Sequence, residues 1–420
     1  MVETLVLVRH AKTQSRTDDI DDAQRALTKA GVRAARASLP RALSLLSAHP
    51  DQAISVWSSP AVRAMETARI VARAVGVDVA DIRTVPCLYP GDADEFFRQL
   101  SDVKGCVIAV GHNPLFEELY RALSGQSLAL EKASACAFTF DAAGAAHLEW
   151  FVQGPDHTLW KTLVDLESAL AAAGGRVSEC AWKFLDDPSD PETLHQYRIA
   201  LRSARSVVAF CEPWMKTKQY KRLQTTLRQL QSQTSRLREL DVMEDSLKAL
   251  QDPDQEELLE NCANAALEER ACFTDTMRQP KTQNKVHDVV RELRDVSWRD
   301  GVEAVGLPRA QVRAHFKELA ASLEYALTYC DFSDAEAAHD VRKQSKQLRY
   351  VAKELNKVLG EDSASLGSHA KALQDKLGEL CDARVNSGLA ASLAGFDNAF
   401  AQAESERAAH IAYEMVEHPA

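Results

Sequence analysis

The pattern of hydrophobic and polar positions divides the chain into two regions. Over roughly the first 150 residues, short aliphatic and β-branched runs alternate with longer stretches of helical period. The expected strands are Leu5–Val8, Ile54–Trp57, Val107–Val110, Ala135–Phe140 and His147–Val152, and the expected helices are 28–48, 61–75, 92–102 and 115–123. This alternation predicts an α/β domain with a mainly parallel sheet.

After the segment 153–156 the strand signal disappears. The rest of the chain has the composition of long helices, rich in Ala, Leu, Glu, Gln, Lys and Arg. Helix breaks are expected at Gly174-Gly175, Asp187-Pro188, Asp252-Pro253, Gly306–Pro308 and Gly360. We therefore expect an α/β domain over 1–155, a linker or first helix over 156–175, and an all-α domain over 176–420.

Composition and charge narrow the possible functions. The chain has 420 residues, enough for two domains, and its net charge of −11 argues against a general nucleic-acid coat. The nine cysteines are scattered without a C-x-x-C pair, so neither a zinc site nor a disulfide framework is indicated. The apolar run Leu5–Val8 is too short for a signal peptide, and no run reaches the ~20 residues of a membrane span. We expect a cytoplasmic protein whose anion-binding sites are local basic clusters.

Three predicted strands end in residues that suit phosphate chemistry. Arg9 and His10 follow the first strand, Arg63 follows the Ser58-Ser59-Pro60 turn, and His112 follows the third strand. Because ligands of open α/β sheets gather at the carboxyl ends of strands, these side chains are expected at one rim. A neutral imidazole can attack phosphorus and carry the phosphoryl group, while arginines stabilise its oxygens.

Each motif alone has an ordinary alternative. An Arg-His pair after a strand occurs by chance, and Gly111-His112-Asn113-Pro114 could be only a turn. Their joint occurrence, in this order and at strand ends, favours the functional interpretation. The pair Asn113-Pro114 further predicts a helix N-cap followed by proline at the first helical position. His112 would then lie beside a helix N-terminus, which attracts anions.

These segments resemble the histidine phosphatase superfamily, in particular its small SixA-type branch of phosphohistidine phosphatases. The resemblance covers residues 1–152 and rests on four segments: Leu-Val-Arg9-His10-Ala-Lys, Arg25-Ala-Leu-Thr-Lys-Ala-Gly31, Ser58-Ser-Pro-Ala-Val-Arg63-Ala-Met-Glu-Thr-Ala68 and Val110-Gly-His112-Asn-Pro. It implies that His10 is the nucleophile, that Arg9 and Arg63 bind phosphate, and that His112 is a second pocket histidine. It implies no metal and no cofactor.

The general acid is not marked by the sequence. Larger superfamily members carry an acidic residue in an insertion, but the corresponding segment 89–95 is short here. Asp92 is the candidate for the general acid. The alternative explanation, of at least equal weight, is that Asp92 is only the N-cap of a helix. A missing acid matters least when the leaving group is good, which favours phosphohistidine or an anhydride over an alkyl phosphate.

The helical half carries a repeated basic stripe. Its first copy is His195, Arg198, Arg202 and Arg205, and its second copy is His339, Arg342, Lys346 and Arg349, continued by Lys353. At ~100° per residue each copy covers an arc of about 80° on one helix face. A similar sequence segment follows each copy: residues 236–241 follow the first copy, and residues 376–382 follow the second. We infer an internal duplication that builds two pseudo-symmetric helical bundles.

A solvated face with i,i+4 ion pairs is the usual explanation of a charged stripe, but it needs acidic partners. None occurs between Glu192 and Glu212, and Asp340 is the only acid between the second histidine and Glu354. The stripe therefore predicts an anion site. Metal binding by the histidines is a lesser alternative, because carboxylate or thiolate ligands do not accompany them.

The stripe and its repeat resemble the CHAD domain, the conserved histidine α-helical domain, over residues 176–420. The resemblance implies binding of inorganic polyphosphate along the matched positions. Further candidates are Lys343 from the flank and, more weakly, Arg222, Arg236, Arg238, Lys371 and Lys376.

The two resemblances together predict a phosphatase with a polyphosphate-binding domain for targeting or regulation. Its expected partners are inorganic polyphosphate and a phosphorylated protein or small molecule, with no specific nucleic acid and no membrane. Polyphosphate granules are a candidate location in the cytoplasm. Two alternatives stay open: a polyphosphate-targeting module with a weak or vestigial phosphatase, and a hydrolase of polyphosphate itself.

Overall fold

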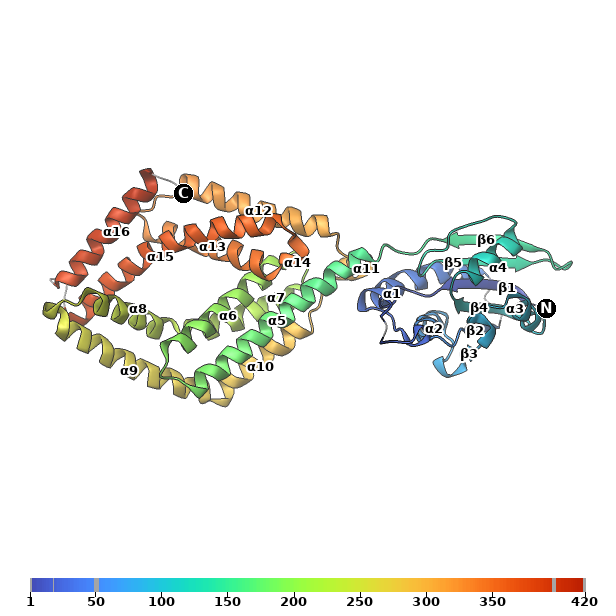
Figure 1. Ribbon diagram of the computed structural model, residues 1–420, viewed down its shortest axis with the longest axis horizontal. Helices are drawn as coiled ribbons and strands as arrows, with labels where there is room; N and C mark the ends of the chain where they lie inside the picture. Colours follow the sequence, from blue (N-terminus) through green and yellow to red (C-terminus); the bar gives the residue numbers. More distant parts are fainter. Residues whose placement is uncertain (1, 18, 49–52, 395–397, 418–420) are drawn as a thin grey trace. The chain divides into compact units, whose positions relative to one another are not determined.

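The strand runs of the first region form one six-stranded sheet in the order β3-β2-β4-β1-β5-β6 (Figure 1). β1 pairs with β4, β4 with β2, and β2 with β3, all in parallel. β5 pairs with β1, and β6 with β5, in antiparallel fashion. The strands are β1 (Val2–Arg9), β2 (Ile54–Ser58), β3 (Arg83–Thr84), β4 (Gly105–Gly111), β5 (Ala135–Phe140) and β6 (Ala146–Val152). The predicted, mainly parallel α/β sheet is confirmed; the two-residue strand β3 was not expected.

Helices cover both faces of this sheet. They are α1 (Lys29–Leu43), α2 (Val62–Val75), α3 (Ala93–Ser101) and α4 (Leu115–Ser124), with short 3₁₀ helices at Asp22–Gln24, Ser44–Ala48, Val79–Asp81 and Pro86–Leu88. Val6 and Val8 pack with α1 and α2, whereas Leu5 and Leu7 pack on the opposite face with α3 and α4. Burial on both faces explains why the parallel strands are continuous apolar runs.

Gly31 fixes the loop that follows β1. A Cβ at this position would lie 2.2 Å from the carbonyl oxygen of Lys12, so only glycine allows α1 to approach the loop backbone this closely. The backbone N–H of Thr28 also donates to the Lys12 carbonyl, at 2.9 Å. The N-terminus of α1 therefore anchors the segment immediately beyond His10.

This computed structural model describes residues 2–17, 19–48, 53–394 and 398–417. They form two units, Met1–Val164 with Asp300–Pro308, and Asp165–Arg299 with Arg309–Ala420. The later segment of the first unit contains α11 (Asp300–Val305), where the Glu303 carbonyl accepts a hydrogen bond from the Trp160 indole at 3.1 Å. No helix in these ranges is long and apolar enough to cross a membrane.

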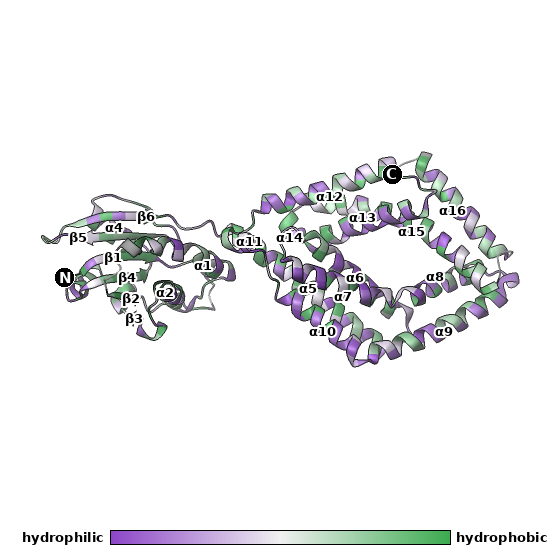
Figure 2. Cartoon of the chain, turned by 180° about the vertical axis from the view of Figure 1, so that it is seen from behind, coloured by the Kyte–Doolittle hydropathy of each residue, from purple (hydrophilic) through white to green (hydrophobic). Residues whose placement is uncertain are grey.

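The second unit is all-helical, as predicted. Its helices are α5 (Thr158–Asp186), whose first residues up to Val164 belong to the first unit, α6 (Pro191–Phe210), α7 (Thr217–Ser232), α8 (Ser235–Leu250), α9 (Glu256–Arg278), α10 (Pro280–Arg294), α12 (Arg309–Tyr329), α13 (Ala335–Glu354), α14 (Asn356–Leu359), α15 (Asp362–Ala394) and α16 (Ala399–Glu417), with a 3₁₀ turn at Pro253–Gln255. Apolar and polar residues alternate around these helices (Figure 2).

The helix order repeats within this unit. α5 and α6 correspond to α12 and α13, the consecutive helices α7 and α8 correspond to the single long α15, and α9 corresponds to α16. The two copies of the basic stripe lie on α6 and α13, which pack against each other. The duplication seen in the sequence is therefore also a duplication of structure.

One expected helix break does not exist. α5 continues through Gly174-Gly175 without interruption. Gly174 instead lies against α10, where an added Cβ would meet the Leu293 side chain at 3.2 Å. Close helix packing accounts for this glycine, and the expectation of a break was wrong.

Candidate functional site

The carboxyl ends of three parallel strands form the first site. The backbone N–H of His10 donates to the Gly111 carbonyl at 2.9 Å, which joins the ends of β1 and β4. Ser59, after β2, donates its backbone N–H to the Val110 carbonyl at 3.0 Å. As expected from the sequence, His10, His112 and Arg63 are all brought to this rim, and each is buried.

The hydrogen bond of His10 determines which ring nitrogen is free. Nδ1 lies 2.8 Å from the carbonyl oxygen of Ala11. A carbonyl can only accept, so Nδ1 carries the proton and Nε2 keeps its lone pair. Burial, followed by the charges of His112, Arg63 and Arg9, lowers the pKa of His10 to about 3, although the Ala11 hydrogen bond opposes the shift. The imidazole is therefore neutral near pH 7, as a nucleophile must be.

His112 lies edge-on to His10, with the two ring centroids 5.3 Å apart. Its Nε2 is 2.7 Å from the Ser59 hydroxyl, which also accepts the backbone N–H of Ala61 at 3.3 Å. Its Nδ1 is buried and has no hydrogen-bond partner among the described atoms. Burial and then the Arg63 charge lower the pKa of His112 to about 4. If Ser59 donates to Nε2, the ring presents Nδ1–H as an unused donor.

Arg63 is held by a carboxylate from the loop after β1. One terminal nitrogen lies 2.9 Å from Asp22 Oδ2, the other donates to the Asp22 carbonyl, and the guanidinium stands 5.7 Å from the Tyr89 ring centroid. The Tyr89 hydroxyl donates to Asp22 Oδ2 at 3.3 Å. Burial opposes ionisation of Asp22, but hydrogen bonds and charges from Arg25 and Arg63 hold its pKa below the ordinary value. Asp22 is thus an ionised positioning group that cannot supply a proton near pH 7.

Arg9 completes the set of donors. Its terminal nitrogen donates to the Leu130 carbonyl, and burial lowers the pKa of its guanidinium. Nε of Arg9 and Nε of Arg63, like Nδ1 of His112, are buried without a partner in the described part of the chain. A buried donor without an acceptor costs about 1–3 kcal/mol. Three such donors around one imidazole indicate a place for a tetrahedral anion.

Two sequence expectations about this site need comment. Asp92 is exposed and accepts the Glu95 backbone N–H at 3.0 Å as the N-cap of α3. Its assignment as general acid thus stays a prediction. The expected N-cap at Asn113 was wrong: α4 begins at Leu115, and the Asn113 side chain binds Glu117 and the Leu130 carbonyl instead.

Asp22, Tyr89 and Ser59 were not assigned roles from the sequence. Ser59 was within a quoted motif, so its position beside a strand end was a usable signal. Asp22 and Tyr89 lie 67 positions apart and meet only in the folded chain. No periodicity or spacing could have brought these two residues together.

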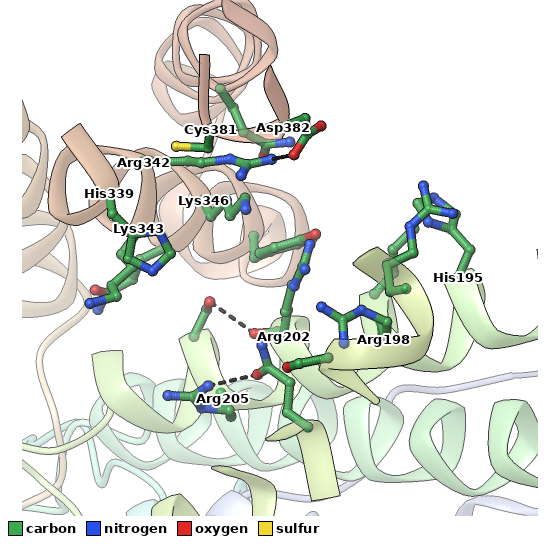
Figure 3. A pocket seen from close by; sticks show the side chains of 18 of the residues that line it. His195, Arg198, Arg202, Arg205, His339, Arg342, Lys343, Lys346, Cys381 and Asp382 are labelled. Atoms are coloured by element: carbon green, nitrogen blue, oxygen red, sulfur yellow. Dashed lines mark hydrogen bonds and ion pairs between the residues drawn. The ribbon is translucent and has the colours of Figure 1, made fainter. Parts of the chain in front are cut away.

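The second site is a cavity of about 670 Å³ in the helical unit. Eight of the predicted basic residues line it, four on α6 and four on α13 (Figure 3). They are the predicted His195, Arg198, Arg202, Arg205, His339, Arg342, Lys343 and Lys346. The cavity is also lined by Arg238, which brings the number of lining Arg and Lys side chains to seven.

Several of these cations are held away from water. Arg198 is only 7% exposed, and burial followed by the charge of Arg202 lowers its pKa to about 9. Burial and then the charges of Arg202 and Arg342 lower the pKa of Lys346 to about 6. Like charges desolvated together destabilise the empty cavity. An anion between the two helices would relieve this repulsion.

Tertiary structure supplies some negative charge that the stripe itself lacks. Arg342 lies 3.2 Å from Asp382 of α15, and Glu239 of α8 also lines the cavity. Lys343 pairs with Asp340 at 2.7 Å. Apart from Lys346, whose pKa is lowered to about 6, six lining cations face two lining carboxylates, so the cavity keeps an excess of positive charge.

Two stripe positions and several weaker candidates lie outside the cavity lining. Arg349 donates to Gln374 at 3.0 Å, just as its counterpart Arg205 donates to Gln231 at 2.6 Å, but of the two only Arg205 lines the cavity. Lys353 is exposed and Arg222 is paired with Glu292. Arg236, Lys371 and Lys376 are likewise not among the described lining residues.

No group of three or more His, Cys, Asp or Glu residues within the described ranges is placed to hold a metal ion.

Comparisons with known proteins agree with this division. The histidine phosphatase superfamily (branch 1) matches residues 5–88, a range that contains His10 and Arg63 but ends before His112. The CHAD domain matches residues 169–391, about half of the chain. No match is found among curated proteins.

Solved structures resemble each region separately. SixA from Agrobacterium tumefaciens is 21% identical, with a TM-score of 0.31, covering 36% of this chain and 98% of its own. The CHAD domain from the plant Ricinus communis is 22% identical, with a TM-score of 0.46, covering 61% of this chain and 88% of its own. PptA from Streptomyces chartreusis is 13% identical, with a TM-score of 0.46, and the match covers 60% and 94% of the two chains.

The first region is therefore similar to the histidine phosphatase superfamily, and through its helical region the chain belongs to the CHAD domain family.

Proposed function

We propose that the first unit hydrolyses an activated phosphate through a phosphorylated His10 and that the cavity of the second unit binds inorganic polyphosphate. The observation that carries the enzymatic part is the tautomer of His10, whose Nδ1–H is bound to Ala11 while Nε2 stays free. An in-line attack by this nitrogen forms a P–N bond as the bond to the leaving group breaks.

Charge stabilisation is the role of the surrounding donors. Arg9, Arg63 and His112 would bind the equatorial oxygens, where negative charge is spread in the transition state. Their unpaired nitrogens are fixed before substrate arrives, so little reorganisation accompanies the reaction. Water then attacks phosphorus, the P–N bond breaks, and the electron pair returns to Nε2 as orthophosphate leaves.

The leaving group follows from the carboxylates near the site. Asp22 is ionised and occupied by Arg63, and Asp92 caps α3. With Asp92, exposed at the cap of α3, as the candidate acid, the reaction favours phosphorus bound to a group that departs easily, such as imidazole or phosphate. We expect phosphohistidine or an anhydride to be cleaved faster than an alkyl phosphate.

For the second unit, the excess of buried cations supports a polyanion as ligand. Basic side chains of α6 and α13 line the same cavity, so a chain of phosphates could contact both copies of the stripe at once. Binding would serve targeting or regulation of the phosphatase.

Both parts can be tested on the full chain. Orthophosphate release from phosphoramidate should be readily detected, exceed release from glycerol phosphate, and be lost in His10→Ala. Acid-labile phosphate should be trapped on the wild-type protein only. Long-chain polyphosphate should bind both proteins equally. A His10→Ala protein that keeps its activity, or a wild type with none, would overturn the enzymatic part, and failure to bind polyphosphate would overturn the other.

A further inference from the structure

A second group of cations lies beside the His10 pocket and is not used by the proposed mechanism. Lys12 follows His10 by two positions, and Lys132 precedes Ala133, whose backbone N–H donates to the carbonyls of Arg9 and His10 at 3.1 and 3.2 Å. The two lysines are thus tied by short backbone connections to the nucleophile itself.

The backbone around Lys132 is held in a costly conformation. Ala133 is buried and has a positive φ of 60°, a left-handed conformation that residues with a Cβ rarely adopt. On the other side, a Cβ on Gly154 would lie 2.1 Å from the Lys132 carbonyl oxygen, so a glycine is required there. Strained backbone of this kind persists where the surrounding structure fixes it, and it clusters at functional sites.

The two lysine side chains lie close together, and His157 has Asp156 as a neighbour of opposite charge. Lys132 is half-buried, and burial, then the charges of Lys12 and Arg9, lower the pKa of Lys132. The His157 ring lies against the Lys132 backbone, and burial, then Lys12 and Lys132, lower the pKa of His157. No ion pair involves either lysine in the part of the chain that the structure describes.

We propose that Lys12, Lys132 and His157 form a second anion subsite, which holds the phosphate next to the scissile one, so that the substrate is a phosphoanhydride. This inference rests on the proposed phosphatase function and narrows its substrate class.

The subsite also explains how the reaction proceeds without an assigned acid. His10 Nε2 attacks the terminal phosphorus, the bridging P–O bond breaks, and its electron pair stays on the departing phosphate chain, which is one unit shorter. Lysine cations stabilise that developing negative charge directly. After water cleaves the P–N bond, the products are orthophosphate, the shortened chain and a proton released to solvent.

A phosphohistidine substrate fits this subsite less well. Its leaving imidazole gains a proton rather than a negative charge as it departs, so neighbouring lysines would not stabilise it. The protein carrying it could instead place acidic side chains near the lysines, and the experiment below includes that outcome.

The test compares substrates on the full-length protein. Tripolyphosphate, phosphoramidate, p-nitrophenyl phosphate and a histidine-phosphorylated protein are assayed with the wild type and with the double variant Lys12→Gln, Lys132→Gln. In the double variant, the ratio of kcat/KM for tripolyphosphate to kcat/KM for p-nitrophenyl phosphate should fall about tenfold or more. Loss of a hydrogen bond to a charged group typically weakens binding by this factor. The cavity of the helical unit is unchanged in this variant and cannot cause the fall.

Lys104→Gln is the matched control. Lys104 is an exposed lysine of the same unit, immediately before β4 and hence at the amino end of the sheet. The control should leave the ratio unchanged.

The outcomes separate the two hypotheses. An unchanged ratio, no cleavage of tripolyphosphate by the wild type, or a fall confined to a histidine-phosphorylated protein would overturn the phosphoanhydride subsite. Activity on phosphoramidate or p-nitrophenyl phosphate that His10→Ala abolishes would still support the proposed phosphatase in each of these cases. Absence of activity on all four substrates would overturn both.

Discussion

The two proposed anion sites of this chain use opposite arrangements of charge. In the His10 pocket, Arg63 is bound to Asp22 and Arg9 is bound to the Leu130 carbonyl, so each cation has a fixed protein partner. In the helical cavity, seven Arg and Lys side chains share only two lining carboxylates. The first site is small and prearranged, whereas the second is large and dominated by repulsion.

The difference indicates what each site can do. Fixed donors around a neutral imidazole stabilise charge that develops during a reaction, because they need not move when it appears. Many cations with few acidic partners instead favour a ligand with many negative charges, since binding of this ligand relieves the repulsion between the cations. Selectivity in the first site comes from geometry, and in the second from the number of charges.

The largest expected effect separates the two sites completely. His10→Ala should lower the phosphatase kcat by about 10⁴-fold or more, as loss of a covalent nucleophile does. The Kd for polyphosphate should stay the same within error. Phosphate-release kinetics and a binding titration on one preparation give both values. Loss of polyphosphate binding in this variant would mean that the sites are not independent.

Salt should act very differently on the two sites. A polyanion releases bound counterions when it binds cationic side chains, so its affinity falls as salt is added. With six or more cationic contacts, the affinity for polyphosphate should fall by a factor on the order of 10³ between 50 and 200 mM salt. The KM of the phosphatase for a single phosphate should change only a few-fold, since few charges are involved. Titrations across this range measure both. A flat affinity for polyphosphate would contradict its assignment to the cavity.

The cavity lining can be compared with the sequence stripe by two substitutions. Arg202→Ala should weaken polyphosphate binding about tenfold or more, because Arg202 lines the cavity beside Lys346. Arg349→Ala, at a stripe position outside the lining, should change Kd by less than threefold by comparison. Arg291, exposed on α10, provides an arginine control. An equal increase in Kd for Arg202→Ala and Arg349→Ala would mean that polyphosphate binds along the whole sequence stripe and not only within the cavity.

Lys346 should link binding to pH. Its pKa of about 6 in the empty cavity means that it is mostly neutral at pH 7, and an anion would raise that pKa. Affinity is therefore highest below pH 6 and falls as pH rises above 6, by up to about tenfold per pH unit. Calorimetry in buffers of different ionisation enthalpy should detect proton uptake, which Lys346→Met should remove. Binding without proton uptake at pH 7 would disprove this link.

The smallest effect concerns the second histidine of the pocket. Ser59→Ala removes the hydroxyl that contacts His112 Nε2 and should lower kcat about fivefold, the value of one ordinary hydrogen bond. Ser59→Thr keeps the hydroxyl and should restore most of the activity. An Ala variant with wild-type kcat would show that Ser59 does not position His112.

The sequence alone determined the elements that local patterns encode. Apolar runs located five of the six strands, and helical periods located the long helices, because both periodicities are properties of short segments. The residues at three strand ends followed from a general rule of parallel sheets, and the repeated stripe followed from helical spacing. These features gave the fold class and most of the candidate residues.

Only the tertiary structure decided how distant segments combine. It placed Asp22 on Arg63, Asp382 on Arg342, and Lys132 near Lys12, pairs that lie 40 or more positions apart in the chain. It also turned α6 and α13 toward one cavity, which left Arg349 outside the lining. Periodicity fixes which side chains share a helix face, but the partner of that face depends on packing across the whole domain. For this reason the candidate residues could be read from the sequence, whereas their charges, partners and proton positions could not.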